Sequence, residues 1–279
     1  MDLRSRVAVL TSRPAIAALV PPLIALALVA CDDGPQHDER ASTMSKGPGA
    51  SALATRRTEV RFATGDGILL SGSLTVPGRR APAVILVHHF GSDRHDWDGF
   101  VPLLDGAGFA TLAYDARGMG RSLSRWPSKQ RYLPPRGEER YLDEMPRDVA
   151  AAIRFVRTRR NIDSQRVAVI GASHGANVAY VSSARHPAGR AAVALSPVRL
   201  RDVLRPRRRA RGVLFISSRL EAAAVLELAR GVVEPRRTML ARDPEAHGVA
   251  LLREAAVRRA ILAWLREHVL AQDQVNGAH

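Results

Sequence analysis

The most informative segment of the chain is residues 166–175, which read Arg166-Val167-Ala168-Val169-Ile170-Gly171-Ala172-Ser173-His174-Gly175. The apolar run at 166–170 is typical of a strand buried on both faces of a parallel sheet, and residues 175–185 suit a helix. A sharp strand-to-helix turn lifts its serine out of the sheet, and glycines on either side avoid the side-chain clashes of such a turn. The helix directs its N-terminal amides at the same point. Ser173 is therefore a candidate nucleophile.

Strands and helices alternate along the rest of the chain. A β-hairpin is predicted at 59–64 and 69–76. Further strands are predicted at 83–87, 109–114, 166–170, 191–195, 213–217 and 237–241, and helices at 97–107, 142–160, 175–185, 220–230 and 249–270. This alternation predicts an α/β fold with a doubly wound, mostly parallel central sheet and helices on both faces. The polar stretch 123–141 is predicted to be an inserted loop at the rim above the site.

Four motifs in this framework resemble those of the α/β-hydrolase superfamily, and the resemblance covers nearly all of residues 59–270. They are Val87-His88-His89-Phe90-Gly91, the loop Asp115-Ala116-Arg117-Gly118-Met119-Gly120-Arg121-Ser122, the Gly-x-Ser-x-Gly turn around Ser173, and His247-Gly248 before the last helix. The dienelactone-hydrolase-like and serine-esterase branches look most similar. The resemblance implies a serine hydrolase that cleaves a carboxylic ester or related acyl bond of a small-molecule substrate through an acyl-enzyme. It implies no cofactor.

The resemblance also implies a catalytic triad. Ser173 would be the nucleophile and His247 the base, because a serine hydroxyl is a poor nucleophile until its proton is taken. The acid lies between them in chain order, and Glu221 falls where the family has it, after strand 213–217. The family's His-Gly is lost there, and Glu replaces the commoner Asp, so Asp202 is a second candidate. A carboxylate at a helix start is also favoured by the helix dipole alone.

The oxyanion that forms during acyl transfer needs hydrogen-bond donors. In the resembling family these are backbone N–H groups, which assigns Phe90 and His174. His89 stands where the family usually has glycine and restricts the backbone beside Phe90. The pair His88-His89 can be read as a structural turn or as a metal pair, but without a clear third ligand no metal site is predicted.

The first 30 residues are typical of an export signal. Three arginines within residues 1–13 precede an apolar run at 15–30, which is too short and too interrupted by proline to favour a membrane-spanning helix. The run ends Leu28-Val29-Ala30-Cys31, and Cys31 is the single cysteine. This resembles the lipobox of bacterial lipoproteins, in which the signal is cut before the cysteine and the thiol is lipidated.

These features predict four segments. They are a lipoprotein signal peptide at 1–30, a flexible tether at 31–58, an α/β-hydrolase domain at 59–272 and a C-terminal tail at 273–279. The expected location is the bacterial cell envelope, with the protein attached to a membrane through lipid on Cys31. Which membrane is used and which oligomeric state is adopted stay open.

Composition narrows the possible partners. The chain has 42 Lys and Arg against 27 Asp and Glu, which gives a formal net charge of +15. Its basic runs at 157–160 and 205–209 contain no interleaved aromatic residues, which argues against single-stranded nucleic acid, and no nucleic-acid partner is predicted. Two other functions stay open: an envelope binding protein that keeps the fold without turnover, and a serine peptidase of the same fold.

Overall fold

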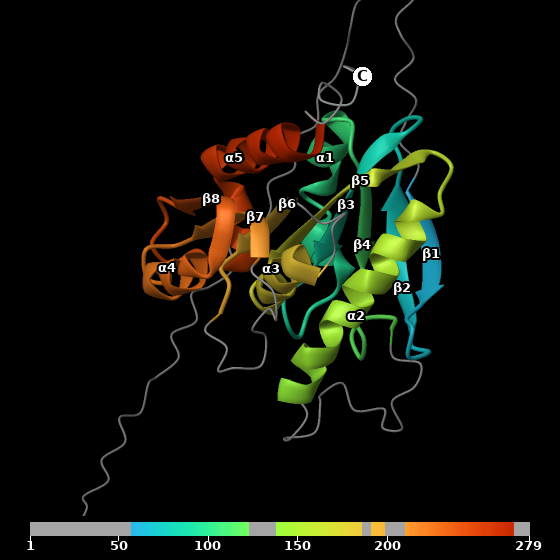
Figure 1. Cartoon of the computed structure of the whole chain (residues 1–279), viewed down its shortest axis with the longest axis horizontal. Coiled ribbons are helices and arrows are strands. Elements are labelled where there is room, and N and C mark those ends of the chain that lie inside the picture. Colours follow the sequence, from blue (N-terminus) through green and yellow to red (C-terminus); the bar gives the residue numbers. More distant parts are fainter. Residues whose placement is uncertain (1–56, 123–137, 186–190, 199–209, 271–279) are drawn as a thin grey trace, which may run out of the picture. The chain divides into compact units, whose positions relative to one another are not determined.

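The strands pair into an eight-stranded sheet with the order β1-β2-β4-β3-β5-β6-β7-β8 (Figure 1). The structure is a computed structural model and describes residues 57–122, 138–185, 191–198 and 210–270. The strands are β1 (Thr58–Ala63), β2 (Leu69–Thr75), β3 (Ala81–Val87), β4 (Ala110–Tyr114), β5 (Ile162–Ala172), β6 (Ala191–Leu195), β7 (Ala210–Ser217) and β8 (Val232–Leu240). β2 pairs antiparallel with both β1 and β4, and the pairs from β4 to β8 are parallel.

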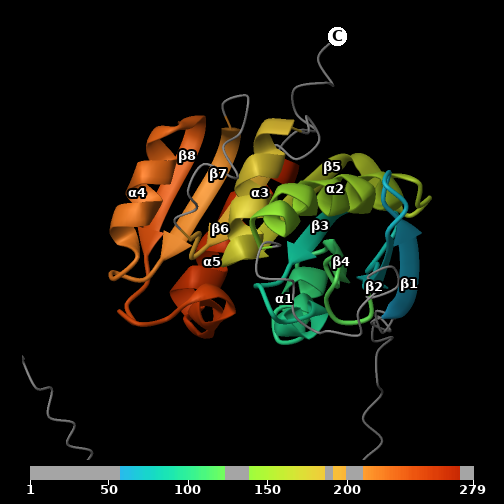
Figure 2. The same ribbon diagram turned by 90° about the horizontal axis from the view of Figure 1, so that it is seen from below.

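Helices cover both faces of this sheet. They are η1 (Arg94–Trp97), α1 (Val101–Gly106), α2 (Glu138–Arg157), α3 (His174–Arg185), α4 (Ala222–Arg230), η2 (Gly248–Arg253), α5 (Ala255–Leu265) and a final turn η3 (Arg266–Leu270). Figure 2 shows α2, α3 and α4 on one face and α1 and α5 on the other. The prediction of a doubly wound, mostly parallel α/β fold is confirmed.

Two hydrophobic clusters, one on each face, explain why the central strands are wholly apolar. Along β5, Val167 and Val169 pack into the cluster that contains α2 and α3, whereas Ala168 and Ile170 pack into the cluster that contains α1 and α5. Side chains alternate between the faces of a strand, so a strand with helices on both sides needs apolar residues at every position.

Two predicted helices differ in the structure. The helix predicted at 97–107 is shorter, because η1 ends at Trp97 and α1 covers only Val101–Gly106, with a proline in its first turn. The segment predicted at 249–270 forms η2, α5 and η3, because Glu254 is extended (φ −76°, ψ 124°) and ends η2 before α5 begins. Helical spacing of apolar residues persists across such a break, so the pattern did not reveal it.

Several other elements begin earlier than predicted, among them β5, α2 and β8, which starts at Val232 instead of 237. β5 starts at Ile162, which pairs with Ala81 of β3, and the polar residues that follow Ile162 hide this part of the strand in the sequence. α2 starts at Glu138, so the predicted loop at 123–141 is too long by its last residues. The remainder of that loop lies outside the described residues.

The predicted signal peptide, Cys31, the tether up to residue 56, the last two residues of the predicted domain (271–272) and the predicted tail at 273–279 also lie outside the described residues. Within the part of the chain that the structure describes, no helix is long and apolar enough to cross a membrane.

Candidate active site

Ser173 occupies a strained turn between β5 and α3. Its φ is +55°, in the left-handed region that non-glycine residues rarely adopt. A Cβ added at Gly171 would lie 1.9 Å from the carbonyl oxygen of Gly175, and one added at Gly175 would lie 2.4 Å from the carbonyl oxygen of Val87. Both glycines are therefore required by close backbone approach, and this packing presents Ser173 at the carboxyl end of the central strand. Strain of this kind, costing about 1–3 kcal/mol, is typical of functional sites.

The loop that carries His247 packs against this turn through Gly248, the residue after His247. Gly248 has a φ of +57°, and a Cβ added there would lie 3.6 Å from Cβ of Ala172 and 3.9 Å from the backbone nitrogen of Ser173. The N–H of Gly248 donates to Oγ of Ser196, at 2.9 Å. Ser196 is fully buried directly after β6. The structure thus places His247 at the same edge of the sheet as Ser173.

Glu221 and His247 form a hydrogen-bonded pair. Nδ1 of His247 lies against Oε1 of Glu221, and the other carboxylate oxygen of Glu221 accepts from the backbone N–H of Ser218 at 3.4 Å. Glu221 precedes α4 as its N-cap residue, yet its side chain makes no capping hydrogen bond to that helix. The carboxylate therefore contacts the histidine and does not simply stabilise the helix start. With Nδ1–H donated to Glu221, Nε2 of His247 is the nitrogen left to accept a proton.

The other carboxylates considered for this role are elsewhere. Asp202 lies outside the described residues. Asp243 and Glu245, which are close to His247 in sequence, are exposed, and the carboxylate of Asp243 accepts from the backbone N–H of Glu245 at 3.0 Å.

Two polar residues that sequence reasoning missed shape the carboxyl end of β6. One is Ser196, described above. The other is Asn177 of α3, whose amide donates to the carbonyl of Val198 and accepts from its N–H, each at 2.9 Å. The signal for Ser196 was weak but present, because a polar residue that follows a short apolar strand lies at the edge where α/β proteins build their sites. Asn177 lies within α3 and had no such signal.

The side chains of Phe90 and His174, whose backbone N–H groups are the predicted oxyanion donors, contact each other. The rings of Phe90 and His174 are 5.4 Å apart between centroids. His174 is the first residue of α3, so its backbone amide belongs to the helix N-terminus, where partial positive charge favours an anion. The close approach of Gly175 to the end of β3 brings this helix start to the loop that carries Phe90.

His89 is paired with the carboxylate of Asp96, a residue of η1. Its Nδ1 lies 2.7 Å from Oδ2 of Asp96, and Oγ of Ser92 donates to the other oxygen of Asp96 at 2.6 Å. The hydrogen bond to Asp96 raises the pKa of His89. Burial alone would raise the pKa of Asp96, but its hydrogen bonds with His89 and Ser92 hold that pKa below the usual range. The pair fixes the loop beside Phe90.

His88 has a separate, structural set of contacts. It is fully buried, its Nδ1–H donates to the carbonyl of His89 at 2.7 Å, and its Nε2 accepts from the backbone N–H of Ala116 at 2.9 Å. Burial lowers the pKa of His88, and an Nε2 that accepts a hydrogen bond carries no proton. Among the described residues, no group of three or more His, Cys, Asp or Glu side chains is arranged to hold a metal ion.

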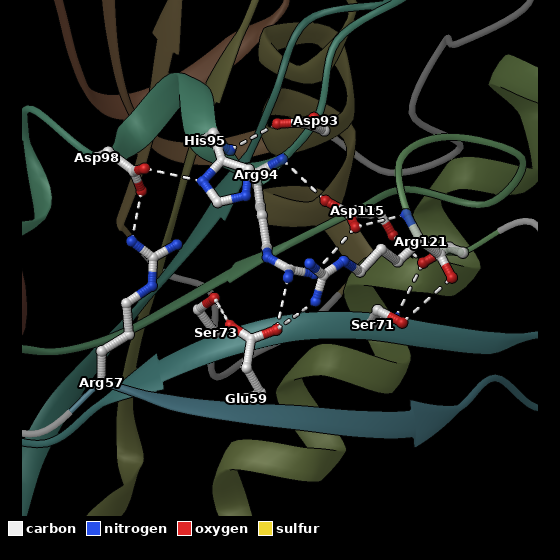
Figure 3. Close-up of polar contacts among 11 residues, drawn as sticks. Arg57, Glu59, Ser71, Ser73, Asp93, Arg94, His95, Asp98, Asp115 and Arg121 are labelled. Carbon is white, nitrogen blue, oxygen red and sulfur yellow. Dashed lines mark hydrogen bonds and ion pairs between the residues drawn. The ribbon is translucent and has the colours of Figure 1, made fainter.

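The loop after β4 is fixed by a buried ion pair (Figure 3). Asp115 accepts from Nη1 of Arg94 at 3.0 Å, from the backbone N–H of Arg94 at 2.9 Å and from the backbone N–H of Arg121 at 2.8 Å. Nη2 of Arg94 reaches Glu59 of β1 at 2.5 Å. Asp115 is thus occupied by structural partners, and it joins the segment after β3 to the loop after β4.

A serine held at the carboxyl end of a parallel strand, with a Glu–His pair on the neighbouring loops, defines the molecule as an α/β-hydrolase. The chain belongs to the family described as serine aminopeptidase, S33 (Hydrolase_4), whose model matches residues 78–273. The predicted superfamily is therefore confirmed.

Solved structures share the fold. An esterase of Pyrococcus furiosus, Pf2001, matches with a TM-score of 0.63 and 18% identity over 81% of this chain and 98% of that one. The dienelactone hydrolase of Anabaena variabilis matches with a TM-score of 0.61 and 20% identity over 77% of this chain and 99% of that one.

A curated protein, epoxide hydrolase B of Mycobacterium tuberculosis, is 29% identical over 111 residues. The match covers 40% of this chain and 27% of that protein, so the chain spans about a quarter of the length of this relative.

Proposed function

We propose that the protein is a serine hydrolase that cleaves a carboxylic ester or related acyl bond through an acyl-enzyme. The observation that carries the proposal is the joint placement of Ser173 in its strained turn and the Glu221–His247 pair on the loops beside it. A small-molecule acyl substrate fits this arrangement.

Each site residue has a defined role in this mechanism. Oγ of Ser173 attacks the acyl carbon while Nε2 of His247 takes its proton, and His247 then gives that proton to the leaving alkoxide. Glu221 orients His247 and stabilises the imidazolium. The backbone N–H groups of Phe90 and His174 donate to the developing oxyanion. Water, deprotonated by His247, then attacks the acyl-enzyme, which releases the carboxylic acid and restores Ser173.

Labelling with a fluorophosphonate, which phosphonylates activated serine hydroxyls, tests the proposal directly. The parent protein should be labelled at Ser173, and Ser173→Ala should not react. No labelling of the parent would favour the alternative of a binding protein that keeps the fold without turnover. Labelling at another serine would contradict the assigned nucleophile.

Glu221→Gln is expected to lower kcat by about 10²–10⁴-fold, because a neutral amide cannot stabilise the imidazolium that forms on His247. The fold should persist, since Glu221 lies near the surface with its side chain 24% exposed. The measurement is steady-state hydrolysis of p-nitrophenyl acetate together with thermal unfolding.

Asp243→Asn is the matched control, because it removes an exposed carboxylate near His247 that does not contact the ring, and it should retain the parent kcat. If Glu221→Gln keeps near-parent activity while Asp202→Asn loses it, the acid of the triad is Asp202 and the assignment of Glu221 is wrong.

A second candidate activity is amide hydrolysis, since the family description names a serine aminopeptidase. The same nucleophile and base would serve, with an amine as the leaving group in place of an alcohol. Comparison of aminoacyl p-nitroanilides with p-nitrophenyl esters separates the two. Faster turnover of the anilides would favour the peptidase.

The proposal includes attachment to a membrane of the bacterial cell envelope through lipid on Cys31. It rests on the basic and apolar leader that ends Leu28-Val29-Ala30-Cys31. Mass spectrometry of the mature N-terminus should find Cys31 as the first residue, carrying acyl chains. An intact Met1, or cleavage at another position, would contradict the anchor.

A further inference from the structure

A cavity of about 680 Å³ lies between α1 and the η2–α5 segment. Figures 1 and 2 both show α1 and α5 side by side on one face of the sheet. The walls of the cavity are mainly apolar, and they also include two arginines and one aspartate. The lining residues that matter here are Phe100, Leu103, Val249, Leu252, Asp96, Arg253 and Arg258. We refer to this space as the α1–η2 cavity; its volume is in the range of small-molecule sites.

Both walls of the α1–η2 cavity continue into the loops of the active site. On one side Asp96 is paired with His89, the residue before Phe90. On the other side Val249 directly follows Gly248, which packs against Ser173. The cavity therefore borders the two loops that flank Ser173.

One arginine of the cavity is held in a fixed orientation. Nη1 of Arg258 donates to the carbonyls of Leu252 and Arg253, at 2.6 and 2.8 Å. Among the residues that the structure describes, the other edge of the guanidinium, formed by Nη2 and Nε, makes no hydrogen bond. The planar fork of arginine matches the geometry of a carboxylate.

The negative and positive charges of the cavity lie in different parts of its wall. Asp96 lies on the side of His89, and its carboxylate is already bound by His89 and Ser92. Arg253 lies four residues beyond Val249 along η2, which corresponds to about 8 Å at the 3₁₀ rise. Positive charge thus lies at the part of the cavity farther from His247, beyond an apolar wall.

We propose that the α1–η2 cavity binds the acyl chain of the substrate and that this chain ends in a carboxylate, which pairs with Arg258 and Arg253. This inference rests on the proposed function, because it places the acyl carbon at Ser173. The apolar side chains of Leu103, Val249 and Leu252 contact the methylene groups of the chain.

Binding is tested with Ser173→Ala, which keeps the site but cannot form the acyl-enzyme. The calorimetric probes are monomethyl adipate, whose acyl chain ends in a carboxylate, and methyl hexanoate, whose chain of the same length ends in a methyl group. Ser173→Ala should bind monomethyl adipate at least about tenfold more tightly, as expected for hydrogen bonds to a charged group. Equal binding of the two esters, or no binding, overturns the proposal.

Substitutions in the same background locate the interaction. Arg258→Gln, and Arg253→Gln as a second variant, should remove the preference for the carboxylate. Arg259→Gln, which changes an exposed arginine of α5 outside the cavity lining, should preserve it. Leu103→Trp, which fills the cavity from α1, should weaken binding of both esters. A preference that survives both glutamine variants, or binding unchanged by Leu103→Trp, also overturns the proposal.

Turnover of p-nitrophenyl acetate by the parent protein distinguishes a failure of the proposed acyl-chain site from a failure of the proposed function. Turnover without the binding preference leaves the proposed function standing and rejects the assigned acyl chain. The binding preference without turnover supports the cavity as a site for a carboxylate-ended chain and contradicts the proposed function.

Discussion

Ser173→Ala is expected to lower kcat for p-nitrophenyl acetate by at least about 10⁴-fold, because the missing hydroxyl oxygen is the atom that bonds to the acyl carbon. Residual hydrolysis above the rate in water would come from the oxyanion donors and substrate binding alone. Alanine has the same Cβ as serine and suffers similar strain at a φ of +55°, so the fold should be retained. Kinetics and thermal unfolding of the same preparation measure both effects.

Ser183→Ala provides the comparison. Ser183 is a buried serine of the same helix, α3, whose Oγ donates to the carbonyl of Tyr180 at 2.7 Å. It should keep the parent kcat within about twofold, since loss of one such hydrogen bond affects stability by roughly 1 kcal/mol and not the reaction. Ester hydrolysis by Ser173→Ala at the parent rate would refute the enzyme mechanism.

Arg94→Met is expected to reduce the free energy of unfolding by about 3–5 kcal/mol, because it leaves the carboxylate of Asp115 buried without its charged partner. Both side chains are only 2% exposed. Methionine retains most of the volume, so the loss reports the charge and hydrogen bonds and not a large cavity. Urea unfolding followed by circular dichroism measures the difference.

Arg57→Met is the matched control, and Figure 3 shows both arginines. Arg57 pairs with Asp98 at 2.6 Å, but these side chains are 37% and 44% exposed, so solvent screens the pair. Its removal should change the free energy of unfolding by at most about 1 kcal/mol. Equal effects of the two substitutions would show that burial adds nothing to the Arg94–Asp115 pair.

Local patterns in the sequence were enough to predict the framework of the site. The turn at Ser173 has its signal within ten residues. His247 and Glu221 were predicted from the resemblance to the α/β-hydrolase superfamily, by their positions before the last helix and after strand 213–217. That the carboxylate of Glu221 reaches His247 depends on how two loops, 26 residues apart in sequence, pack together.

The residues that support the site were harder to predict because they act through contacts between distant segments. Ser196 binds a backbone N–H that is 52 residues away, and Arg94 pairs with Asp115 across 21 residues. A serine or arginine in a loop has no periodicity that would reveal such a partner. The break at Glu254 was missed for a related reason, because its extended backbone leaves the apolar spacing around it unchanged.

The position of β8 at one end of the sheet has a consequence for solubility. An edge strand exposes unpaired backbone groups to which a strand of another molecule can add. In β8, Pro235 has no N–H to offer, Arg236 donates to the carbonyls of Ala229 and Val232 at 3.1 Å, and Arg237 pairs with Glu267. Proline and charge on an edge oppose aggregation through strand addition. Some of the arginine excess of this chain therefore protects the border of its sheet.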